Sequence, residues 1–556
     1  MSTPNLAEKL DFIVHLWNET GIHHWVVSPG SRNAPIVAAL LRNASMRLHS
    51  APDERSAAFV ALGIAQSQQY PAGFLCTSGT ALVNAFPAVC EAYYQRVPLV
   101  VVSADRPEYL IDQWDGQTLR QSGIFGTYTR KNAHINPRKI SAEECLSCIY
   151  STIENSIQPI PGPVHFNIEL DEPIYEGIQE ISEKDLPVES LLVSIPNYVP
   201  TPFVYKEFYE FTAPTLQQLT EQLQALSELP ENPKIAIVVG QNVPSNSLTI
   251  SLRALEQQLP VFCDVGSHQP NLGLKQWDWG LLKRAIPNDL KPDLIFTLGT
   301  TVLSKPLKNK LSEWKPKHIH LGLTGEIGDP FQTQPQHWQG YEADLLATLS
   351  LALAPESDWN SRNHQFLKSW ETFIEQQPLK INDLQEPFQQ ELQWIRTFFD
   401  GLNSREYIIH MGNSMPIRYA SWSGNCPAPI YANRGVSGID GCISTAVGSA
   451  IANPDKRVFC IVGDVSSIYD SNAFWTDYPT NLTVIIINNH GGRIFDWIEG
   501  PNKFSALRPF IHTPTSVDFS HLAAFFKIPY QGLNIQQPEE SCKQAIQFSG
   551  GIIELK

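Results

Sequence analysis

Helical and strand patterns alternate along the first third of this chain. Apolar residues recur at helical spacing near its start, at Leu6, Leu10, Ile13, Val14 and Trp17. Patterns that fit short strands then follow, separated by helical stretches, at residues 25–27, 73–76, 99–102 and 164–168, with a further short strand at 46–49. Strands that alternate with helices in this way predict a parallel sheet covered by helices.

The remaining two thirds show the same alternation, and the last third repeats the first. Apolar runs in the middle third stand at residues 234–239, 261–264, 293–298 and 318–321. In the last third, three runs match runs of the first at an offset of about 384 residues: 409–414 with 26–31, 459–463 with 74–79 and 482–485 with 99–102. A constant offset of this length predicts two domains of similar fold separated by a different one.

A chain of 556 residues is too long for one hydrophobic core. We predict three α/β domains, each with a doubly wound parallel sheet, in which the first and third are similar and the central one differs. Their predicted ranges are 1–185, 186–390 and 391–556. These limits fall in the proline-rich stretches near residues 187–202 and 376–393, where few contacts are expected to cross.

Composition narrows the class of protein. Hydrophobic residues make up 42% of the chain and charged residues 17%, which is typical of a globular protein. The formal net charge of −16, with no basic block to offset it, argues against binding to nucleic acid or to anionic membranes. Any anionic substrate must therefore be met by locally placed arginines.

The nine cysteines indicate a reducing compartment. Their number is odd, and most lie in apolar runs such as 459–462, where free thiols pack as small hydrophobic groups. The N-terminus shows no basic segment followed by an apolar one, and no apolar run approaches the length of a membrane span. We therefore expect a cytoplasmic protein.

Two consecutive strand ends in the last third carry oxygen ligands suited to a metal. Gly463 and Asp464 end one apolar run, and Asn489 ends the next, 25 residues after the aspartate and two before Gly491. A carboxylate, an amide oxygen and the backbone carbonyl of Gly491 suit Mg²⁺, which completes its coordination with phosphate oxygens and water. Glycines at the carboxyl ends of strands also let the backbone approach a diphosphate. The alternative is an aspartate that caps a helix beside an unrelated Asn-Gly turn.

This Gly-Asp and Asn-Asn pair resembles the motif of thiamine-diphosphate decarboxylases and carboligases, with Val465 where that motif usually has glycine. In that class, a pyrimidine domain of the same fold, usually from a second subunit, contributes one glutamate. Glu54, at the start of a predicted helix, is the candidate, and its carboxyl group would favour the cofactor tautomer that removes a proton. Taken alone, Asp53 and Glu54 are better explained as acids that satisfy a helix N-terminus, and only the motif at Asp464 favours the catalytic role for Glu54.

Several further motifs stand along nearly the whole chain, namely Ser28–Pro35, Asp53–Arg55, Thr77–Thr80, Ser103–Pro107, Gly116-Gln117 with Arg120-Gln121, Asn433–Gly441 and Asn489–Phe495. Together they resemble the pattern of the 2-succinyl-5-enolpyruvyl-6-hydroxy-3-cyclohexene-1-carboxylate synthase family. The resemblance implies a transferase that decarboxylates 2-oxoglutarate and adds the succinyl-semialdehyde carbanion to isochorismate by 1,4-addition, in menaquinone or phylloquinone biosynthesis. It also implies thiamine diphosphate, Mg²⁺ or Mn²⁺, and a homodimer or a dimer of dimers with the site at the subunit interface.

The same resemblance implies roles for individual residues. Cofactor contacts would come from Glu54, Thr80, Ser437, Ile439, Gly463, Asp464, Val465, Ser466, Asn489, Gly491 and Ile494, with the metal on Asp464, Asn489 and Gly491. Isochorismate would be held by Ser31, Arg32, Arg106, Gln117 and Lys305, and 2-oxoglutarate by Ser414, Arg418 and Arg434. Ile494 and Phe495 would wall the pocket, and catalysis would depend on Glu54, Arg32, Gln117, Arg418 and Arg434. Pro306 stands where the family pattern has a second basic residue after Lys305.

The chemistry of the substrates agrees with this reading. Both are dianions, and arginines that reach carboxylates with two hydrogen bonds suit them in a chain of negative net charge. Two alternatives remain open. One is another thiamine-diphosphate decarboxylase or carboligase acting on a 2-oxoacid, such as an acetolactate-synthase-like enzyme. The other is a protein of this fold that no longer catalyses a reaction.

Overall fold

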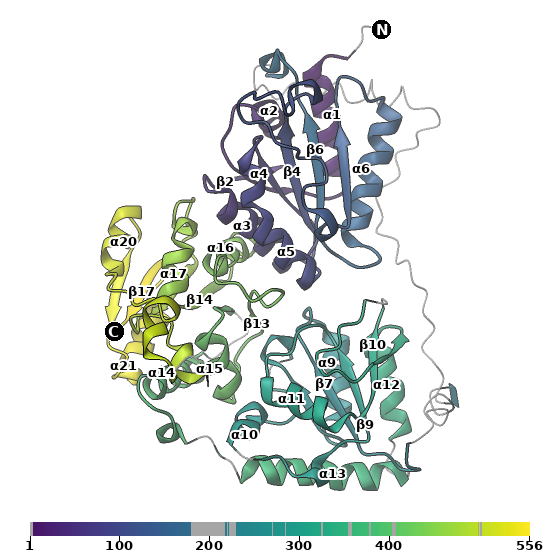
Figure 1. The fold of residues 1–556 in the computed structure, drawn as a ribbon, viewed down its shortest axis with the longest axis vertical. Helices are drawn as coiled ribbons and strands as arrows, with labels where there is room; N and C mark the ends of the chain where they lie inside the picture. The colour runs from purple at the N-terminus through teal and green to yellow at the C-terminus, as the bar shows by residue number, and fades with distance from the viewer. Residues whose placement is uncertain are drawn as a thin grey trace.

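The computed structural model describes residues 4–178, 217–218, 221 and 229–556, except 270, 284, 324–325, 354–357, 377, 379, 403–406, 499 and 501–502. These residues form three parallel sheets, each flanked by helices, as Figure 1 shows. The predicted α/β class is therefore confirmed. Of the predicted domain limits, that between 185 and 186 lies outside the described residues, and that between 390 and 391 falls within helix α14 (Phe388–Gly401).

Six parallel strands form the first sheet, in the order β2-β1-β3-β4-β6-β5. The strands are β1 (His24–Val27), β2 (Arg47–Ser50), β3 (Ala72–Cys76), β4 (Leu99–Asp105), β5 (Lys131–Ile135) and β6 (Val164–Glu169). The helices are α1 (Leu6–Glu19), α2 (Ala34–Arg42), α3 (Glu54–Gln68), α4 (Thr80–Asn84), α5 (Phe86–Gln95) and α6 (Ala142–Ile157). A capping box of Asn5 and Glu8 fixes where α1 begins.

The third sheet repeats the first strand for strand, in the order β13-β12-β14-β15-β17-β16. Its strands are β12 (Tyr407–Met411), β13 (Ile430–Tyr431), β14 (Arg457–Gly463), β15 (Leu482–Ile487), β16 (Tyr530–Leu533) and β17 (Gly551–Leu555). Besides α14, its helices are α15 (Met415–Ser423), α16 (Cys442–Ala452), α17 (Asp464–Tyr469), α18 (Ile494–Trp497), α19 (Arg508–Ile511), α20 (Phe519–Phe526) and α21 (Pro538–Gln547). The repeat predicted from the sequence is confirmed as two sheets of one topology.

The central sheet has five parallel strands in a different order, β11-β10-β9-β7-β8. They are β7 (Ile235–Val239), β8 (Val261–Cys263), β9 (Leu294–Leu298), β10 (Lys317–Gly322) and β11 (Gln336–Gln339). Its helices are α9 (Asn246–Leu255), α10 (Trp277–Lys283), α11 (Lys305–Trp314), α12 (Glu342–Ala352) and α13 (Asp358–Glu375). In Figure 1, α13 runs along the end of this domain that is farthest from the first domain.

Burial separates the inner strands from those at the sheet edges. Every residue of β3, β4, β7, β9, β15 and β17 is buried, as expected for parallel strands covered by helices on both faces. The edge strands β5, β11, β13 and β16 are partly exposed and carry polar residues. The apolar runs of the sequence do not include these four strands. A strand at the edge of a sheet pairs with one neighbour and is partly exposed, so its residues need not all be apolar.

The first and third domains meet through equivalent helices. α3 follows β2 and α16 follows β13, and the two helices pack against each other (Figure 1). Gly63 stands against the backbone of Thr445, and Gly448 against the backbone of Val60, so both contacts need a residue without a side chain. One cluster of buried apolar residues runs through both domains. Their relative position is therefore fixed by close helix packing rather than by a flexible linker.

The central domain contacts both of its neighbours. Arg130 of the first domain forms an ion pair with Glu326 at 2.8 Å. On the other side, Nε1 of Trp422 donates to Oδ2 of the buried Asp278 at 3.1 Å, and Trp279 packs in the core of the third domain. Polar and apolar contacts thus join all three domains.

The cysteines are free thiols, and five of the nine are buried. Burial raises the pKa of the Cys145 thiol to about 12, so this residue of α6 is a poor nucleophile at neutral pH. Within the described part of the chain, no helix combines the length and the apolar character needed to cross a membrane.

The α3–α16 contact leads to a test of the domain arrangement. Alanine in place of glycine normally stabilises the middle of a helix by up to about 1 kcal/mol. A Cβ atom at position 448, however, would lie 2.0 Å from the carbonyl oxygen of Val60 and 2.8 Å from the backbone nitrogen of Ile64. We therefore expect Gly448→Ala to destabilise the protein by about 1–3 kcal/mol, measured as a lower midpoint of thermal unfolding.

Gly328→Ala provides the matched control, because a Cβ atom at that position meets nothing within 4 Å. Its melting curve should follow that of the unmodified protein. A Gly448→Ala protein that melts at or above the unmodified midpoint would show that the two helices do not pack at this distance.

Candidate active site

Loops at the carboxyl edge of the third sheet carry the residues that the sequence singles out. β12 leads to Ser414, β13 to Arg434, β14 to Asp464 and β15 to Asn489. Because the strands are parallel, these loops lie at one edge of the sheet, where open α/β folds bind ligands. β15 ends at Ile487, so the asparagine stands on the loop just past the strand rather than in it.

Asp464 is buried at the start of α17 and ties two of these loops together. Its Oδ1 accepts from the backbone nitrogen of Val465 and its Oδ2 from that of Gly491, both at 2.7 Å. Burial raises the pKa of Asp464, and these backbone N–H groups oppose that rise. A single carboxylate thus fixes the loop after β15 against the start of α17.

The amide of Asn489 is held by Glu391, a buried residue of α14. Nδ2 of Asn489 donates to Oε1 of Glu391 at 2.8 Å, and the hydroxyl of Tyr419 donates to Oε2 at 2.5 Å. Burial raises the pKa of Glu391 to about 7, against these hydrogen bonds. The amide oxygen of Asn489 is buried and has no hydrogen-bond partner among the described residues. Since buried polar atoms are normally paired, this oxygen is open to accept a hydrogen bond or to bind a cation.

These residues fit a magnesium diphosphate. Among the described residues, no group of three or more His, Cys, Asp and Glu is arranged to hold a metal ion by itself. Asp464, the unpartnered oxygen of Asn489 and the carbonyl of Gly491 offer a few oxygens, which is how Mg²⁺ is held when phosphates and water complete its shell. A Cβ atom at Gly463 would meet nothing within 4 Å, so there is open space beside the aspartate.

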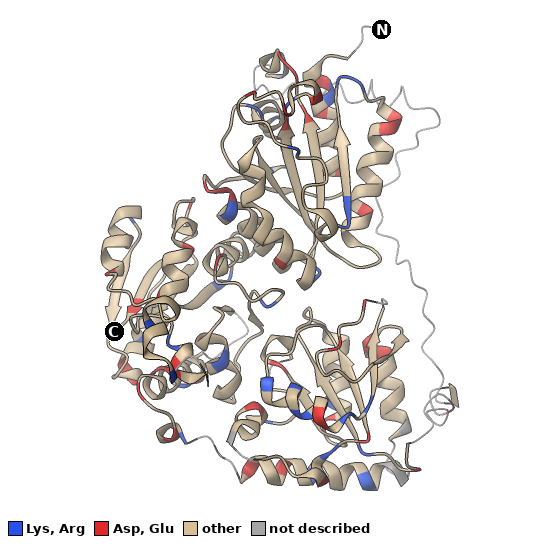
Figure 2. Cartoon of the chain, in the orientation of Figure 1, with Lys and Arg blue, Asp and Glu red and all other residues tan. Residues whose placement is uncertain are grey.

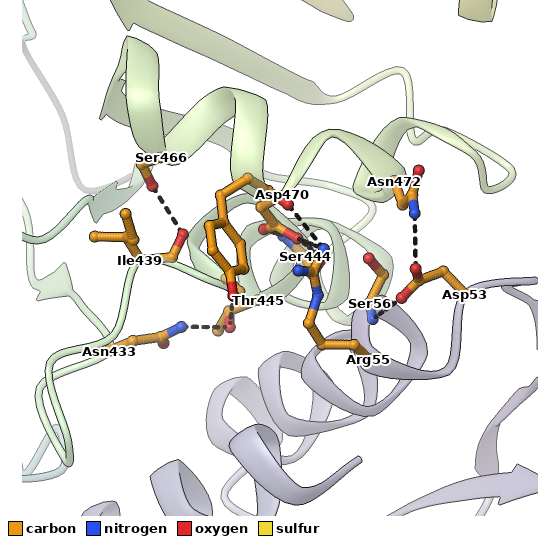
Figure 3. A network of polar contacts seen from close by, with 12 residues as sticks. Asp53, Arg55, Ser56, Asn433, Ile439, Ser444, Thr445, Ser466, Asp470 and Asn472 are labelled. Atoms are coloured by element: carbon orange, nitrogen blue, oxygen red, sulfur yellow. Dashed lines mark hydrogen bonds and ion pairs between the residues drawn. The ribbon is translucent and has the colours of Figure 1, made fainter. Parts of the chain in front are cut away.

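The loop before α16 is held beside this group. Oγ of Ser466 donates to the carbonyl of Ile439 at 3.2 Å (Figure 3). Nδ2 of Asn413 donates to the carbonyls of Asn433 and Gly438, at 2.7 and 2.6 Å. The loop that carries Ile439 is therefore fixed on both sides, at the start of α17 and at the end of β12.

Half-buried cations gather next to this loop. Nη1 of Arg434 donates to Oδ1 of Asn413 at 2.9 Å, and Nη1 of Arg418 donates to the carbonyl of Ser414. Burial lowers the pKa of Arg418, and the charge of Arg434 lowers it further. Burial also lowers the pKa of Lys308 on α11, with a contribution from both arginines. Figure 2 marks basic residues on α11 and α15, and cations held close together in this way attract an anionic ligand.

Glu54 is the first residue of α3, but Asp53 caps that helix. Oδ1 of Asp53 accepts from the backbone nitrogen of Ser56 at 2.8 Å, and its Oδ2 accepts from Nδ2 of Asn472 at 2.7 Å (Figure 3). Oε2 of Glu54 accepts instead from Nδ2 of Asn84 at 3.3 Å. By sequence, either acid could satisfy the N-terminus of this helix. In the structure Asp53 does so, whereas Glu54 is half-buried and its carboxylate accepts from Asn84.

Asp470 anchors the start of α3 to the third domain. The backbone nitrogen and Oγ of Ser444 donate to its carboxylate at 2.7 and 2.6 Å, and Nη2 of Arg55 lies 4.0 Å from it (Figure 3). Nη2 of Arg55 also donates to the carbonyl of Tyr469 at 2.9 Å. Both neighbours of Glu54 therefore contact the segment that follows α17.

Arg32 and Arg106 lie in the first domain, each beside an acid of that domain. Arg32 is buried, with Nη1 donating to the carbonyl of Leu170 at 2.8 Å and Nη2 lying 3.2 Å from Glu172. Nη1 of Arg106 lies 3.0 Å from Asp115. An anionic ligand at either arginine would have to join or replace these carboxylates.

The remaining predicted residues are divided among the three domains. Five are exposed, namely Ser31, Thr80, Gln117, Lys305 and Ser437. Three on the third domain are half-buried, namely Val465, Ile494 and Phe495. The structure thus brings together the third-domain candidates, and it places the others on the first domain and on α11.

Sequence motifs do not identify Glu391, Tyr419 or Lys308. Glu391 and Tyr419 belong to helices without a recognisable motif, so the contacts of Glu391 with Asn489 and with Tyr419 are visible only in the fold. Lys308 could have been found, because it follows Lys305 by three residues and therefore lies near it on one face of a helix. It supplies a second cation on α11 although Pro306 follows Lys305 directly.

Comparison with known proteins agrees with this geometry. Residues 9–124 match the family described as thiamine pyrophosphate enzyme, N-terminal TPP binding domain, and residues 411–550 match the corresponding C-terminal TPP binding domain. The first match includes Glu54, and the second includes Asp464 and Asn489. The chain therefore has the two domains that bind thiamine diphosphate.

Curated relatives are similar to almost the whole chain. Proteins from Cytophaga hutchinsonii and Desulfotalea psychrophila are each 34% identical, over 96% and 92% of this chain and 93% and 90% of their own. One from Flavobacterium johnsoniae is 32% identical over 93% of this chain and 90% of its own. All three are named 2-succinyl-5-enolpyruvyl-6-hydroxy-3-cyclohexene-1-carboxylate synthase. With its two cofactor domains and this similarity over its whole length, the chain belongs to the 2-succinyl-5-enolpyruvyl-6-hydroxy-3-cyclohexene-1-carboxylate synthase family.

Proposed function

We propose that this chain decarboxylates 2-oxoglutarate and adds the resulting four-carbon unit to isochorismate, a step of menaquinone biosynthesis. The observation that carries the proposal is the group of half-buried cations, Arg418, Arg434 and Lys308, whose two arginines follow strands at the same edge of the third sheet as Asp464 and Asn489. Both substrates are dianions, and such a cation group suits them in a chain of net charge −16. A carboligase that acts on pyruvate has one carboxylate to hold and needs fewer cations.

Thiamine diphosphate, when bound, supplies the electron sink for loss of carbon dioxide from a 2-oxoacid. We assign its pyrimidine end to Glu54, whose carboxylate is not used to cap α3. Ile439 would pack beneath it, on a loop that Ser466 and Asn413 hold in place. Ile494 and the neighbouring Phe495 would exclude water from the reacting end.

The diphosphate end would lie at the carboxyl edge of the third sheet with Mg²⁺ or Mn²⁺. The protein ligands of the metal would be Asp464, the amide oxygen of Asn489 and the carbonyl of Gly491. The unpartnered buried oxygen of Asn489 supports this assignment. Further cofactor contacts would come from Thr80, Ser437, Gly463, Val465 and Ser466.

The two substrates would be held by different loops. We assign the carboxylates of 2-oxoglutarate to Ser414, Arg418 and Arg434. We assign isochorismate to Ser31, Arg32, Arg106, Gln117 and Lys305, with Lys308 as an additional cation. The acids that pair with Arg32 and Arg106 would keep these guanidinium groups oriented before an anionic substrate arrives.

We also propose that two copies associate, so that the pyrimidine domain of one works with the diphosphate domain of the other. Large apolar side chains are exposed on helices α4, α5 and α17 and on the segment that follows α17. They are Val83, Tyr94, Ile468, Tyr469 and Trp475, with exposed fractions from 38% to 55%. Exposed apolar groups of this size favour burial against a second protein surface.

The direct test is turnover of both substrates together. The purified chain is incubated with thiamine diphosphate, Mg²⁺ and 2-oxoglutarate, with and without isochorismate, and the product is identified by mass. We expect isochorismate to disappear only when all components are present, with a product heavier by one succinyl-semialdehyde unit. Release of carbon dioxide with isochorismate untouched would show a different acceptor, and binding of the cofactor without any turnover would favour a non-catalytic protein.

Glu54→Gln tests the assigned acid. Gln keeps the shape of the side chain but removes the carboxylate, so kcat should fall by about 10²–10⁴-fold while cofactor affinity changes much less. Steady-state kinetics and titration with thiamine diphosphate measure the two effects. Glu143→Gln is the matched control, because it makes the same change at an exposed position in the first turn of α6 and should leave kcat nearly unchanged. Equal kcat values for the two variants would refute the role of Glu54.

Arg418→Met tests the 2-oxoglutarate side of the site. Loss of a charged hydrogen bond to a substrate carboxylate costs about 1.5–3 kcal/mol, which lowers kcat/KM for 2-oxoglutarate by about 10- to 100-fold. The KM for isochorismate should change far less. Arg253→Met, at an exposed position of α9, controls for loss of a positive charge. A selective rise in the KM for isochorismate would assign Arg418 to the other substrate.

A further inference from the structure

Consecutive asparagines after β15 are each held by a buried glutamate and a tyrosine. In both groups, the asparagine Nδ2 and the tyrosine hydroxyl donate to the two oxygens of one carboxylate, over distances of 2.5 to 2.8 Å. The two glutamates are 1% and 0% exposed. The groups are Asn489–Glu391–Tyr419 and Asn488–Glu554–Tyr530.

The two groups differ at the asparagine oxygen. Oδ1 of Asn488 accepts from the backbone nitrogen of His490 at 3.4 Å. Oδ1 of Asn489 is buried and has no hydrogen-bond partner among the described residues. The group of Asn488 is therefore complete within the protein, and that of Asn489 leaves an oxygen to be satisfied by something else.

The carboxylate of Glu391 determines which end of the Asn489 amide remains open. An ionised carboxylate can only accept hydrogen bonds, whereas an amide group has a donor end and an acceptor end. In the structure the NH₂ group of Asn489 faces Glu391, and a reversed amide would set its oxygen against a carboxyl group whose two oxygens both accept hydrogen bonds. The oxygen of Asn489 then points away from the glutamate, and an oxygen is what a hard divalent cation binds.

The position of Glu391 on α14 is otherwise an apolar one. Trp394, Ile395 and Phe398, which follow it at helical spacing, are fully buried in the core of the third domain. Burying a carboxyl group on such a face costs stability unless its partners compensate. The charge of Asp464 also acts on Glu391, so two carboxylates lie near the open amide oxygen.

We propose that Glu391 is a positioning residue that orients the amide of Asn489 so that its oxygen is presented to the divalent cation. The inference rests on the metal site of the proposed function. Hydrogen-bonded partners of metal ligands commonly contribute 10- to 100-fold to metal affinity. Glu391 acts through Asn489 and need not touch the metal, the cofactor or the substrates.

Glu391→Gln separates orientation from side-chain shape. Glutamine can face Asn489 with either its oxygen or its NH₂ group, so the amide of Asn489 is no longer forced into one orientation. We expect the dissociation constant of Mn²⁺, measured by electron paramagnetic resonance in the presence of thiamine diphosphate, to rise by about tenfold or more. Glu554→Gln is the matched control, because it makes the same change in the neighbouring group, and Mn²⁺ affinity should stay within about twofold.

Exchanging the acid and the amide between positions 391 and 489 provides an independent test. Asn489→Asp alone places two carboxylates against each other and should weaken Mn²⁺ binding. In the double variant Asn489→Asp, Glu391→Gln, the glutamine NH₂ can donate to one aspartate oxygen and leave the other for the metal. The double variant should therefore bind Mn²⁺ more tightly than Asn489→Asp does.

The outcomes separate a failure of the positioning role of Glu391 from a failure of the proposed metal site. If the unmodified protein binds no Mn²⁺ with thiamine diphosphate, the proposed metal site is wrong. If it binds Mn²⁺ and Glu391→Gln binds as tightly, or if both glutamine variants weaken binding equally, the positioning role is overturned. A double variant that binds no better than Asn489→Asp overturns it as well, whatever the effect of the single change on stability.

Discussion

Helices α3 and α16 lie close enough for backbone to meet backbone, and the relative position of the first and third domains of one chain depends on this contact. Each helix follows the second strand of its own sheet, so the contact relates two domains of one topology. Gly63 and Gly448 make the approach possible, and a shared apolar core stabilises it. Because Glu54 is the first residue of α3, the packing of that helix also sets where the glutamate lies relative to the third domain.

Buried acids extend this contact into the loops that hold ligands. Glu91 of α5 accepts from the backbone nitrogens of Gly435 and Val436 at 2.6 and 2.8 Å, so the first domain holds the loop that carries Arg434. Asp470 binds the start of α16 and lies near Arg55, the residue after Glu54. Carboxylates on one domain thus order backbone and side chains of the other, and the loops are positioned before a ligand binds.

How far the sequence predicts the structure depends on where each residue lies. Inner strands such as β4 and β15 are apolar throughout, so their runs identify them, whereas the edge strand β5 mixes Lys131, Asn132 and His134 with apolar residues and gives no such run. Asp464 and Asn489 belong to a motif with fixed spacing and could be predicted. Glu391 is 98 residues from its partner in the chain, and no spacing rule connects them.

Charge explains why the predicted arginines and the residues outside the motifs matter together. A protein of net charge −16 that binds a diphosphate and dianionic substrates must offset repulsion locally, and Arg418, Arg434 and Lys308 do so at the cost of partial burial. The buried negative charge of Glu391 likewise costs free energy of folding unless a cation is bound nearby. A site that holds both signs of charge out of water is less stable when empty than when filled, so its ligands should stabilise the fold as they bind. We therefore expect Glu391 and Lys308, which the motifs leave out, to act with the predicted arginines in coupling ligand binding to the stability of the fold.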